Sequence, residues 1–229
     1  MKCLSFDIWN TLLDLEKLYS LLSEEISESY SRDANEVRDL LLSAYRKALA
    51  LRLEGAFRSP ILDSAAVFSK ELGMSEEELF RAFVRILRKR EIEELAFEDA
   101  KIAVRELKGL GYRMGLLGNV MFWPGMVTRY ILERNDLLEY FDASLFSDEA
   151  GVQKPDKRAF EAIAERLNCK VEDLVHIGDS LENDLAGALL SGVSAVLIRR
   201  EVERAIHIGK KAVIVRALTE LPQILSKLQ

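Results

Sequence analysis

Three aspartates and one lysine stand out in this chain as candidate reactive groups. Asp7 follows a short apolar run, Asp179 and Asp184 lie in HIGDSLEND, and Lys154 lies in GVQKPD. Three carboxylates brought into one cleft repel one another and raise their pKa values, and a hard divalent cation such as Mg²⁺ removes that repulsion. The residue types therefore predict a Mg²⁺ site that includes Asp7, Asp179 and Asp184.

Phosphoryl transfer is the chemistry that this combination favours. A carboxylate such as Asp7 can attack phosphorus and form an aspartyl-phosphate, which divides the transfer into two steps. Lys154 would hold Asp7 and the incoming anion together, and Asn119 can donate a hydrogen bond to a phosphate oxygen. We therefore expect Asp7 and Lys154 to be catalytic, and Asn119 and Lys154 to bind phosphate.

Short apolar strands position these groups. The pattern predicts strands at 3–7, 112–117, 143–146, 175–177 and 194–198, with another at 212–215, and helices between them from residue 98 onward. Such alternation favours a parallel sheet with helices on both faces, in which ligands bind at the carboxyl ends of the strands. Asp7, Gly118-Asn119, the loop reaching Lys154 and Gly178-Asp179-Ser180 all follow predicted strands.

Residues 16–90 show only helical patterns. An apolar stripe runs from Val37 to Leu51 at helical spacing, and Ser75-Glu76-Glu77-Glu78 forms a capping box. This segment of about four helices lies between the first and second strands. We therefore predict an α/β core formed by residues 1–14 and 95–229, with a helical insertion at 15–94.

Composition narrows the choice of partners. The 229 residues carry a net charge of −6, which disfavours nucleic acid and anionic membranes as partners. The two cysteines, Cys3 and Cys169, match no metal or redox spacing, and the first residues match no secretory leader. These features favour a cytoplasmic protein, and the abundance of charged residues with few Gln is typical of hyperthermophiles. No pattern predicts the oligomeric state or the natural substrate.

Four motifs resemble those of the haloacid dehalogenase-like (HAD) hydrolase superfamily: FDIWNTLLD, LLGN, GVQKPDKRAF and HIGDSLENDLAGA. The resemblance covers the whole chain and implies a Rossmann-like core with a helical cap inserted after the first motif. It implies Asp7 as nucleophile and Lys154 as the group that holds the charges together. It further implies Mg²⁺ bound by Asp7, the backbone carbonyl of Trp9 and Asp179, with Asp184 acting through water.

Two positions depart from the superfamily pattern. Its phosphatases carry a second Asp, a general acid worth roughly two to four orders of magnitude in rate, where this chain has Trp9. Its dehalogenases carry an aromatic residue there. Gly118 stands where Thr or Ser is usual, so water or the Gly118 amide would bind phosphate in place of a hydroxyl.

The fourth motif favours the phosphatase reading. The superfamily's metal-free dehalogenases replace the first acid of that motif with an uncharged residue, whereas this chain keeps both Asp179 and Asp184. We therefore expect a Mg²⁺-dependent phosphatase acting on a small phosphorylated metabolite, slow because of Trp9. The alternatives are a metal-free haloacid dehalogenase-type hydrolase and a catalytically weak phosphate-binding or regulatory protein.

Other histidine, aromatic and arginine residues are expected to have structural rather than catalytic roles. His176 lies in a predicted buried strand and is expected to be a core residue, and His207 is expected to be structural or at the surface. Phe122 and Trp123 are expected to form an apolar contact between cap and core. Four arginines of the insertion are expected to be solvated charges without a function in the site: Arg52, Arg58, Arg88 and Arg90.

Overall fold

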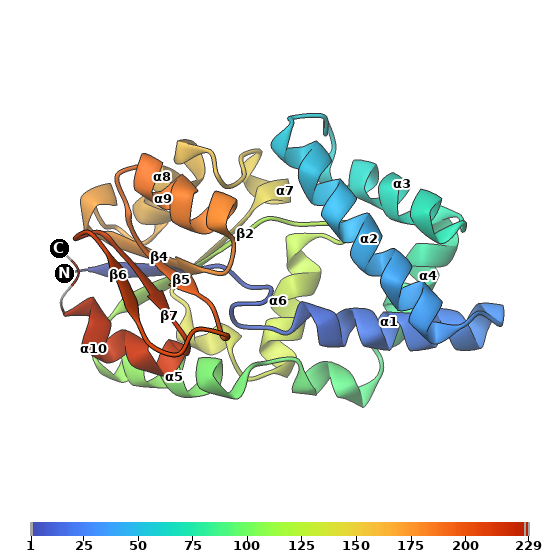
Figure 1. Ribbon diagram of the computed structural model, residues 1–229, viewed down its shortest axis with the longest axis horizontal. Coiled ribbons are helices and arrows are strands. Elements are labelled where there is room, and N and C mark those ends of the chain that lie inside the picture. Colours follow the sequence, from blue (N-terminus) through green and yellow to red (C-terminus); the bar gives the residue numbers. More distant parts are fainter. Residues whose placement is uncertain (1, 227, 229) are drawn as a thin grey trace. The chain divides into compact units, whose positions relative to one another are not determined.

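The computed structural model describes residues 2–226 and 228 and contains a seven-stranded sheet (Figure 1). The strand order is β3-β2-β1-β4-β5-β7-β6, and every neighbouring pair is parallel except β6 and β7. The predicted α/β class is confirmed. Strand β6 was not predicted, because its three exposed edge residues show no burial pattern. The strands are β1 (Cys3–Phe6), β2 (Arg113–Gly118), β3 (Ala143–Phe146), β4 (Leu174–Gly178), β5 (Ser194–Ile198), β6 (Ile206–Ile208) and β7 (Ala212–Val215).

The central strand β1 aligns the ends of its two neighbours. Phe6 pairs in register with Leu116 of β2 and with Ile177 of β4. All four residues of β1 are buried, as expected for a parallel strand covered on both faces. The segments that follow β1, β2 and β4 therefore leave the sheet side by side, at its carboxyl edge.

Helices cover both faces of the sheet. Helices α8 (Lys157–Arg166) and α9 (Gly187–Leu190) lie on one face, and α5 (Glu98–Gly109) and α10 (Leu221–Leu225) on the other (Figure 1). Phe160 and Ile163 of α8 are fully buried in a core shared with the strands. The remaining elements are short: α7 (Ser147–Ala150), the 3₁₀ turns η2 (Leu138–Tyr140), η3 (Val171–Asp173) and η5 (Leu218–Glu220), and a π-helical turn η4 (Leu181–Ala186).

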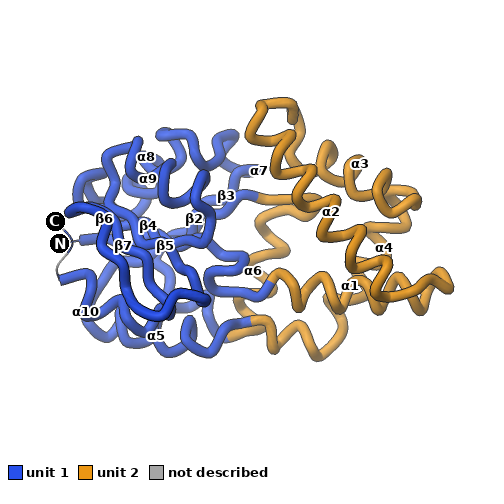
Figure 2. The backbone as a smooth tube through the Cα atoms, in the orientation of Figure 1, with its two compact units in different colours: residues 1–14, 96–119, 136–229 blue, residues 15–95, 120–135 orange. Residues whose placement is uncertain are grey.

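A second compact unit is helical (Figure 2). Residues 1–14, 96–119 and 136–229 make up unit 1, and residues 15–95 and 120–135 make up unit 2. The capping box predicted at Ser75 is present, because Ser75 and Glu78 bond each other's backbone N–H groups. None of the helices within residues 2–226 combines the length and hydropathy needed to cross a bilayer. Unit 2 contains α1 (Leu15–Tyr30), α2 (Ala34–Leu53), α3 (Pro60–Leu72), α4 (Glu76–Ile86), η1 (Arg90–Glu94) and α6 (Gly125–Arg134).

Residues 120–135 group with unit 2, although the sequence assigns them to the core. Phe122 packs 4.7 Å from the ring of Phe68, and Trp123 stacks on Phe83 at 4.8 Å, so both aromatic residues belong to the interior of the helical unit. Helix α6 ends at Arg134. Asp136 adopts a φ of +56°, which a right-handed helix does not allow.

Cys3 and Cys169 are not joined in a disulfide, and both contribute to the core of unit 1. Cys169, after α8, packs against the core cluster that includes Cys3 at the start of β1. Burial and this contact raise the pKa of the Cys169 thiol to about 12. No sequence pattern indicates this contact, because it depends on the packing of α8 against the sheet.

Candidate active site

Asp7 stands at the carboxyl end of β1 and is held by the neighbouring strand. Its N–H donates to the carbonyl of Ile177 in β4 at 2.8 Å, which continues the ladder of the parallel pair. Its Oδ2 accepts a hydrogen bond from the Thr11 hydroxyl at 3.3 Å. Burial raises the pKa of Asp7 to about 6, against the opposing charge of Lys154. The carboxylate is 15% exposed, so it remains accessible to a ligand.

Lys154 joins two of the three carboxylates. Its Nζ lies 2.7 Å from Oδ1 of Asp7 and 2.7 Å from Oδ1 of Asp184, and the side chain is only 2% exposed. Burial alone would lower the lysine pKa, but the two carboxylates raise it above its ordinary value. Lys154 is therefore a fixed positive charge beside Asp7.

Asp184 is the most fully bonded of the three acids. Besides Lys154, its oxygens accept hydrogen bonds from Nε2 of His176 at 2.9 Å and from the N–H of Ser180 at 2.8 Å. Burial would raise its pKa, but Lys154 and His176 hold it well below the ordinary range. Gly178 makes room for this carboxylate, because a Cβ at position 178 would lie 2.3 Å from Cγ of Asp184. Because His176 and Ser180 hold Asp184 in place, the ion pair with Asp184 fixes the position of the Lys154 ammonium group.

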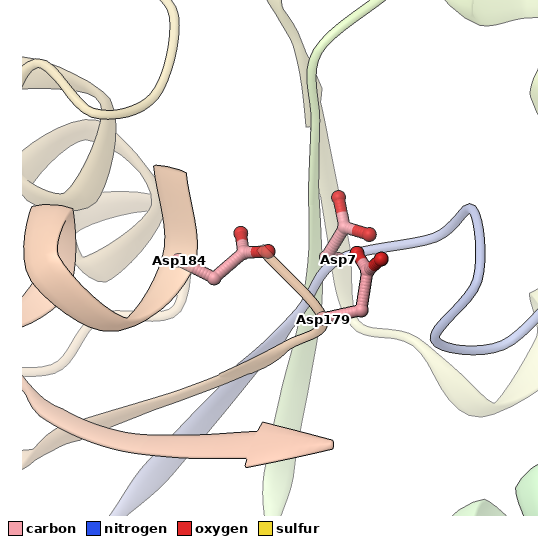
Figure 3. Close-up of side chains that lie close together, drawn as sticks. All are labelled: Asp7, Asp179 and Asp184. Carbon is pink, nitrogen blue, oxygen red and sulfur yellow. The ribbon is translucent and has the colours of Figure 1, made fainter. Parts of the chain in front are cut away.

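Asp179 follows β4 directly and completes the acidic cluster (Figure 3). Oxygen atoms of Asp7, Asp179 and Asp184 all lie within 4.8 Å of one another. Burial and the charges of Asp7 and Asp184 raise the pKa of Asp179 to about 8. The backbone carbonyl of Asp179 accepts a hydrogen bond from Arg199, which follows β5. The residue is thus held at a point where two other carboxylates oppose its ionisation.

The donor set of this cluster fits a hard divalent cation. It consists of carboxylate oxygens, which Mg²⁺ prefers, and a cation among them would offset the repulsion that raises the pKa of Asp179. Lys154 already shares its positive charge between Asp184 and one oxygen of Asp7. Asp179 and the second oxygen of Asp7 are therefore the groups best suited to bind the cation directly, with Asp184 behind them.

Asn119 pairs with the backbone of the lysine. Its Nδ2 donates to the carbonyl of Lys154 at 2.8 Å, and its Oδ1 accepts from the Lys154 N–H at 3.0 Å. The segment after β2 is thereby attached to the loop that carries Lys154, whose peptide bond to Pro155 is cis. One of the two Nδ2 protons is used in this pairing, and the other is available for a ligand.

Gly118, at the end of β2, has no space for a side chain. A Cβ there would lie 2.7 Å from Cδ1 of Ile8 and 3.0 Å from the ring of Phe146. These two buried side chains occupy the volume that a Ser or Thr side chain would need. The absence of a hydroxyl at this position therefore has a packing cause in this chain.

Trp9 lies in the turn that follows Asp7. It pairs with Leu13 in an isolated bridge, and Asn10 between them adopts a φ of +61°, which Asn tolerates better than most residues. The Trp9 side chain is half-buried. Position 9 therefore supplies an aromatic side chain, and not a carboxyl group that could act as a general acid.

His176 has a larger part in the site than the sequence suggested. It is fully buried, and burial lowers its pKa, so the ring is neutral. Because the Asp184 carboxylate can only accept, His176 donates from Nε2 and accepts from the Ser5 hydroxyl at Nδ1, 2.8 Å away. Ser5 and His176 are paired in register on β1 and β4. The feature of the sequence that could have indicated this hydrogen bond is one polar residue within each of two apolar strands.

The chain matches a known family model. The model for haloacid dehalogenase-like hydrolases matches residues 1–192. Among curated relatives, glyceraldehyde 3-phosphate phosphatase from Methanothermobacter thermautotrophicus is 30% identical over 56% of this chain and 56% of its own length. The enzyme of the same name from Pyrococcus furiosus is 24% identical over 100% of this chain and 93% of its own length. The chain therefore spans little more than half of the first of these relatives.

Solved structures share the fold. The magnesium-bound HAD-hydrolase YfnB from Bacillus subtilis matches with a TM-score of 0.77 at 21% identity, over 98% of both chains. L-2-haloacid dehalogenase from Xanthobacter autotrophicus matches with a TM-score of 0.74 at 16% identity, over 100% of both chains. These similarities describe the fold, which this chain shares with a dehalogenase. They do not distinguish phosphate-ester hydrolysis from dehalogenation.

Proposed function

The chain belongs to the haloacid dehalogenase-like hydrolases, and from this premise we propose that it is a Mg²⁺-dependent phosphatase that acts through an aspartyl-phosphate on Asp7. The observation that carries the proposal is the buried Lys154 between Asp7 and Asp184, with Asp179 in the same cluster. Relatives named as phosphatases support the choice of phosphate esters. The substrate class is a small phosphorylated metabolite.

In the proposed first step, an oxygen of Asp7 attacks phosphorus while the bond from phosphorus to the leaving oxygen breaks. Lys154 keeps Asp7 ionised and oriented, and it stabilises negative charge on the transferring group. The Gly118 N–H and the second Nδ2 proton of Asn119 donate to phosphoryl oxygens. In the second step water attacks phosphorus, the bond between phosphorus and the Asp7 oxygen breaks, and inorganic phosphate leaves as the carboxylate is regenerated.

Asp7, Asp179 and the backbone carbonyl of Trp9 would hold Mg²⁺, with Asp184 contributing through water. When bound, Mg²⁺ would neutralise charge on the phosphoryl group. The ionised form of Asp179, which its neighbours oppose, becomes favourable beside a cation. We also propose that residues 1–14 and 95–229 form a hydrolase core and residues 15–94 a helical cap that selects the substrate, with residues 120–135 of the core segment packing in the helical unit.

Trp9 favours a second candidate, a metal-free hydrolase that acts on a carbon–halogen bond. In that reaction Asp7 would attack carbon, release halide and form an alkyl ester. The three clustered carboxylates argue against it, since without a cation they oppose an anionic substrate. A third candidate is a phosphate-binding or regulatory protein of weak activity.

Hydrolysis of p-nitrophenyl phosphate tests the proposal, because an aryl leaving group needs little protonation and does not depend on an acid at position 9. We expect Mg²⁺-dependent turnover that chelator and Asp7→Asn each abolish. The matched control is Asp39→Asn, which removes an exposed carboxylate on α2 and should retain activity. Turnover of 2-haloacids in chelator, without aryl phosphatase activity, would support the dehalogenase instead. If neither activity is found, the third candidate, a phosphate-binding or regulatory protein, would be supported.

A further inference from the structure

Several arginines of this chain donate to backbone carbonyls. Arg52, which the sequence predicts to be a solvated charge, is 3% exposed and donates to a backbone carbonyl of unit 2, so that prediction is wrong. In unit 1, two consecutive arginines follow β5. Arg199 donates to the carbonyl of Asp179. Arg200 donates to the carbonyl of Thr11, four residues after Asp7 in the chain.

Two donors hold the Asp7 carboxylate, one on each oxygen. Nζ of Lys154 lies 2.7 Å from Oδ1 of Asp7, and the hydroxyl of Thr11 donates to Oδ2 at 3.3 Å. Rotation of the carboxylate about its Cβ–Cγ bond would break both contacts. The direction of the Asp7 oxygens therefore depends on the position of Thr11 as well as on Lys154.

Thr11 lies in the tight turn that follows β1, and its side chain is fully buried. The N–H groups of Leu12 and Leu13 both donate to the carbonyl of Ile8, at 2.8 and 2.9 Å. Asn10 adopts a φ of +61° in the same turn. These features define the shape of the turn, whereas its position within unit 1 depends on contacts with other segments.

Arg200 provides such a contact. Its Nη2 donates to the carbonyl of Thr11 at 3.2 Å, and its Nη1 donates to Oδ2 of Asp99 at 2.6 Å. The guanidinium carbon lies 3.9 Å from the centre of the Phe97 ring. Strand β4 separates β5 from β1, so Arg200 joins the turn to a segment that the hydrogen bonds of the sheet do not join to it directly.

The partners of Arg200 are themselves anchored in unit 1. Oδ2 of Asp99 also accepts a hydrogen bond from the N–H of Leu218 at 2.9 Å. The N–H of Phe97 donates to the carbonyl of Leu12 at 3.0 Å. A planar guanidinium that stacks on a ring and is bonded through both Nη atoms is held in one orientation. Arg200 and Phe97 therefore fix two successive carbonyls of the turn.

We propose that Arg200 is a positioning residue that acts on Asp7 through Thr11. Asp99 orients the guanidinium, the guanidinium holds the Thr11 carbonyl, and the Thr11 hydroxyl holds Asp7. The consequence for catalysis rests on the proposed phosphatase function, in which Asp7 attacks phosphorus. A nucleophile displaced by about 1 Å can cost roughly a hundredfold in rate, so loss of Arg200 should lower kcat.

A double-mutant cycle on p-nitrophenyl phosphate hydrolysis tests this route. Thr11→Val removes the hydroxyl at nearly constant volume, and Arg200→Met removes the N–H donors but keeps an unbranched side chain. Each should lower kcat roughly ten- to hundredfold with little change in KM, in line with a hydrogen bond to a charged group. In the Thr11→Val background, Arg200→Met should lower kcat by less than about twofold. Arg200→Lys, which retains the charge on a single nitrogen, should recover only part of kcat.

Arg113→Met is the matched control, because Arg113 also donates to a backbone carbonyl of unit 1, that of Leu167 at 3.0 Å. It should retain kcat. Full activity in either Thr11→Val or Arg200→Met would overturn the proposal. Effects of these two variants that multiply in the double variant, or an equal loss of kcat in Arg113→Met, would overturn it as well.

Hydrogen–deuterium exchange tests the same contact without a substrate. In Arg200→Met, amides of residues 8–13 should exchange faster than in the wild-type protein, whereas Arg113→Met should leave their exchange unchanged. If the wild-type protein hydrolyses no aryl phosphate, the proposed phosphatase function fails and the exchange decides alone. Faster exchange of residues 8–13 in Arg200→Met would then retain Arg200 as the residue that positions the Asp7 turn, and unchanged exchange would overturn that role.

Discussion

At the scale of single residues, Lys154 determines how the three acids differ. It forms ion pairs with Asp184 and with one oxygen of Asp7, whereas Asp179 stands beside two like charges. The three carboxylates therefore have different tasks although their side chains are the same. In the proposed mechanism, Asp184 orients Lys154, Asp7 attacks phosphorus, and Asp179 binds the cation.

Trp9→Asp tests whether the site lacks only a general acid. An acid at position 9 can protonate the leaving oxygen, so we expect kcat for alkyl phosphates to rise by up to roughly two to four orders of magnitude. Aryl phosphates, which leave without protonation, should change little. The control Trp9→Phe keeps an aromatic ring without an acid and should give no gain. An unchanged alkyl phosphatase rate in Trp9→Asp would mean that the pocket does not accept alkyl phosphates productively.

Gly118→Ser should destabilise the protein although it restores the hydroxyl usual in the superfamily. The new Cβ would lie 2.7 Å from Cδ1 of Ile8, and overpacking of this kind costs roughly 1–3 kcal/mol. Ile8→Val removes that Cδ1, so the serine should cost less in the Ile8→Val background. Urea denaturation of the two single variants and the double variant measures the coupling. Equal costs in both backgrounds would show that Ile8 is not the obstacle.

At the scale of elements, the site depends on three strands ending at the same level and on loops that bond to one another. The Asn119 amide joins the segment after β2 to the Lys154 backbone, while His176 joins β4 to Asp184. These contacts place Lys154 and Asp184 without any contact to a substrate. Loss of one should reduce activity through the position of the lysine.

Asn119→Ala removes both hydrogen bonds to the Lys154 backbone. Each such bond contributes about 1 kcal/mol, so unfolding free energy should fall by roughly 2 kcal/mol. Aryl phosphatase kcat should fall as well, because Lys154 then lacks one of its supports. The exposed Asn35→Ala on α2 is the control for the substitution itself. Full activity in Asn119→Ala would show that other contacts suffice to position Lys154.

The sequence predicted the strands that carry the site better than the contacts between them. Asp7, Lys154 and Asp179 could be placed at strand ends because short apolar runs with a following turn are local signals. The roles of His176 and Ser5 depend on the pairing of β1 with β4, which no local pattern contains. The grouping of Phe122 and Trp123 with unit 2 likewise depends on aromatic contacts distant in sequence.

At the scale of the whole molecule, the acidic cluster should make stability depend on pH and on Mg²⁺. Asp7 and Asp179 have pKa values raised from 3.8 to about 6 and about 8, so folding favours their protonated forms. The stability that they contribute is present at low pH and is lost as the pH rises from about 4 to about 8. Asp184, whose pKa is lowered, contributes stability that is fully present above about pH 4 and is lost as the pH falls from there through its lowered pKa.

Mg²⁺ should therefore stabilise the protein more at pH 8 than at pH 6. At pH 8 the ionised Asp7 and Asp179 repel each other without a cation, while at pH 6 protonation of Asp179 competes with binding. Differential scanning calorimetry at both pH values, with Mg²⁺ and with chelator, measures the effect. Asp179→Asn should remove most of the Mg²⁺-dependent rise in Tm. A rise that is larger at pH 6 would contradict the assignment of Asp179 to the cation.

The most direct test of the central claim is a search for the covalent intermediate. The protein is mixed with p-nitrophenyl phosphate and Mg²⁺, quenched in acid within one turnover, digested with pepsin and analysed by mass spectrometry. We predict one phosphoryl group on the peptide that contains Asp7, and none in Asp7→Asn or in chelator. Mg²⁺-dependent turnover without a phosphorylated Asp7 peptide, or a phosphoryl group on another residue, would contradict the aspartyl-phosphate mechanism.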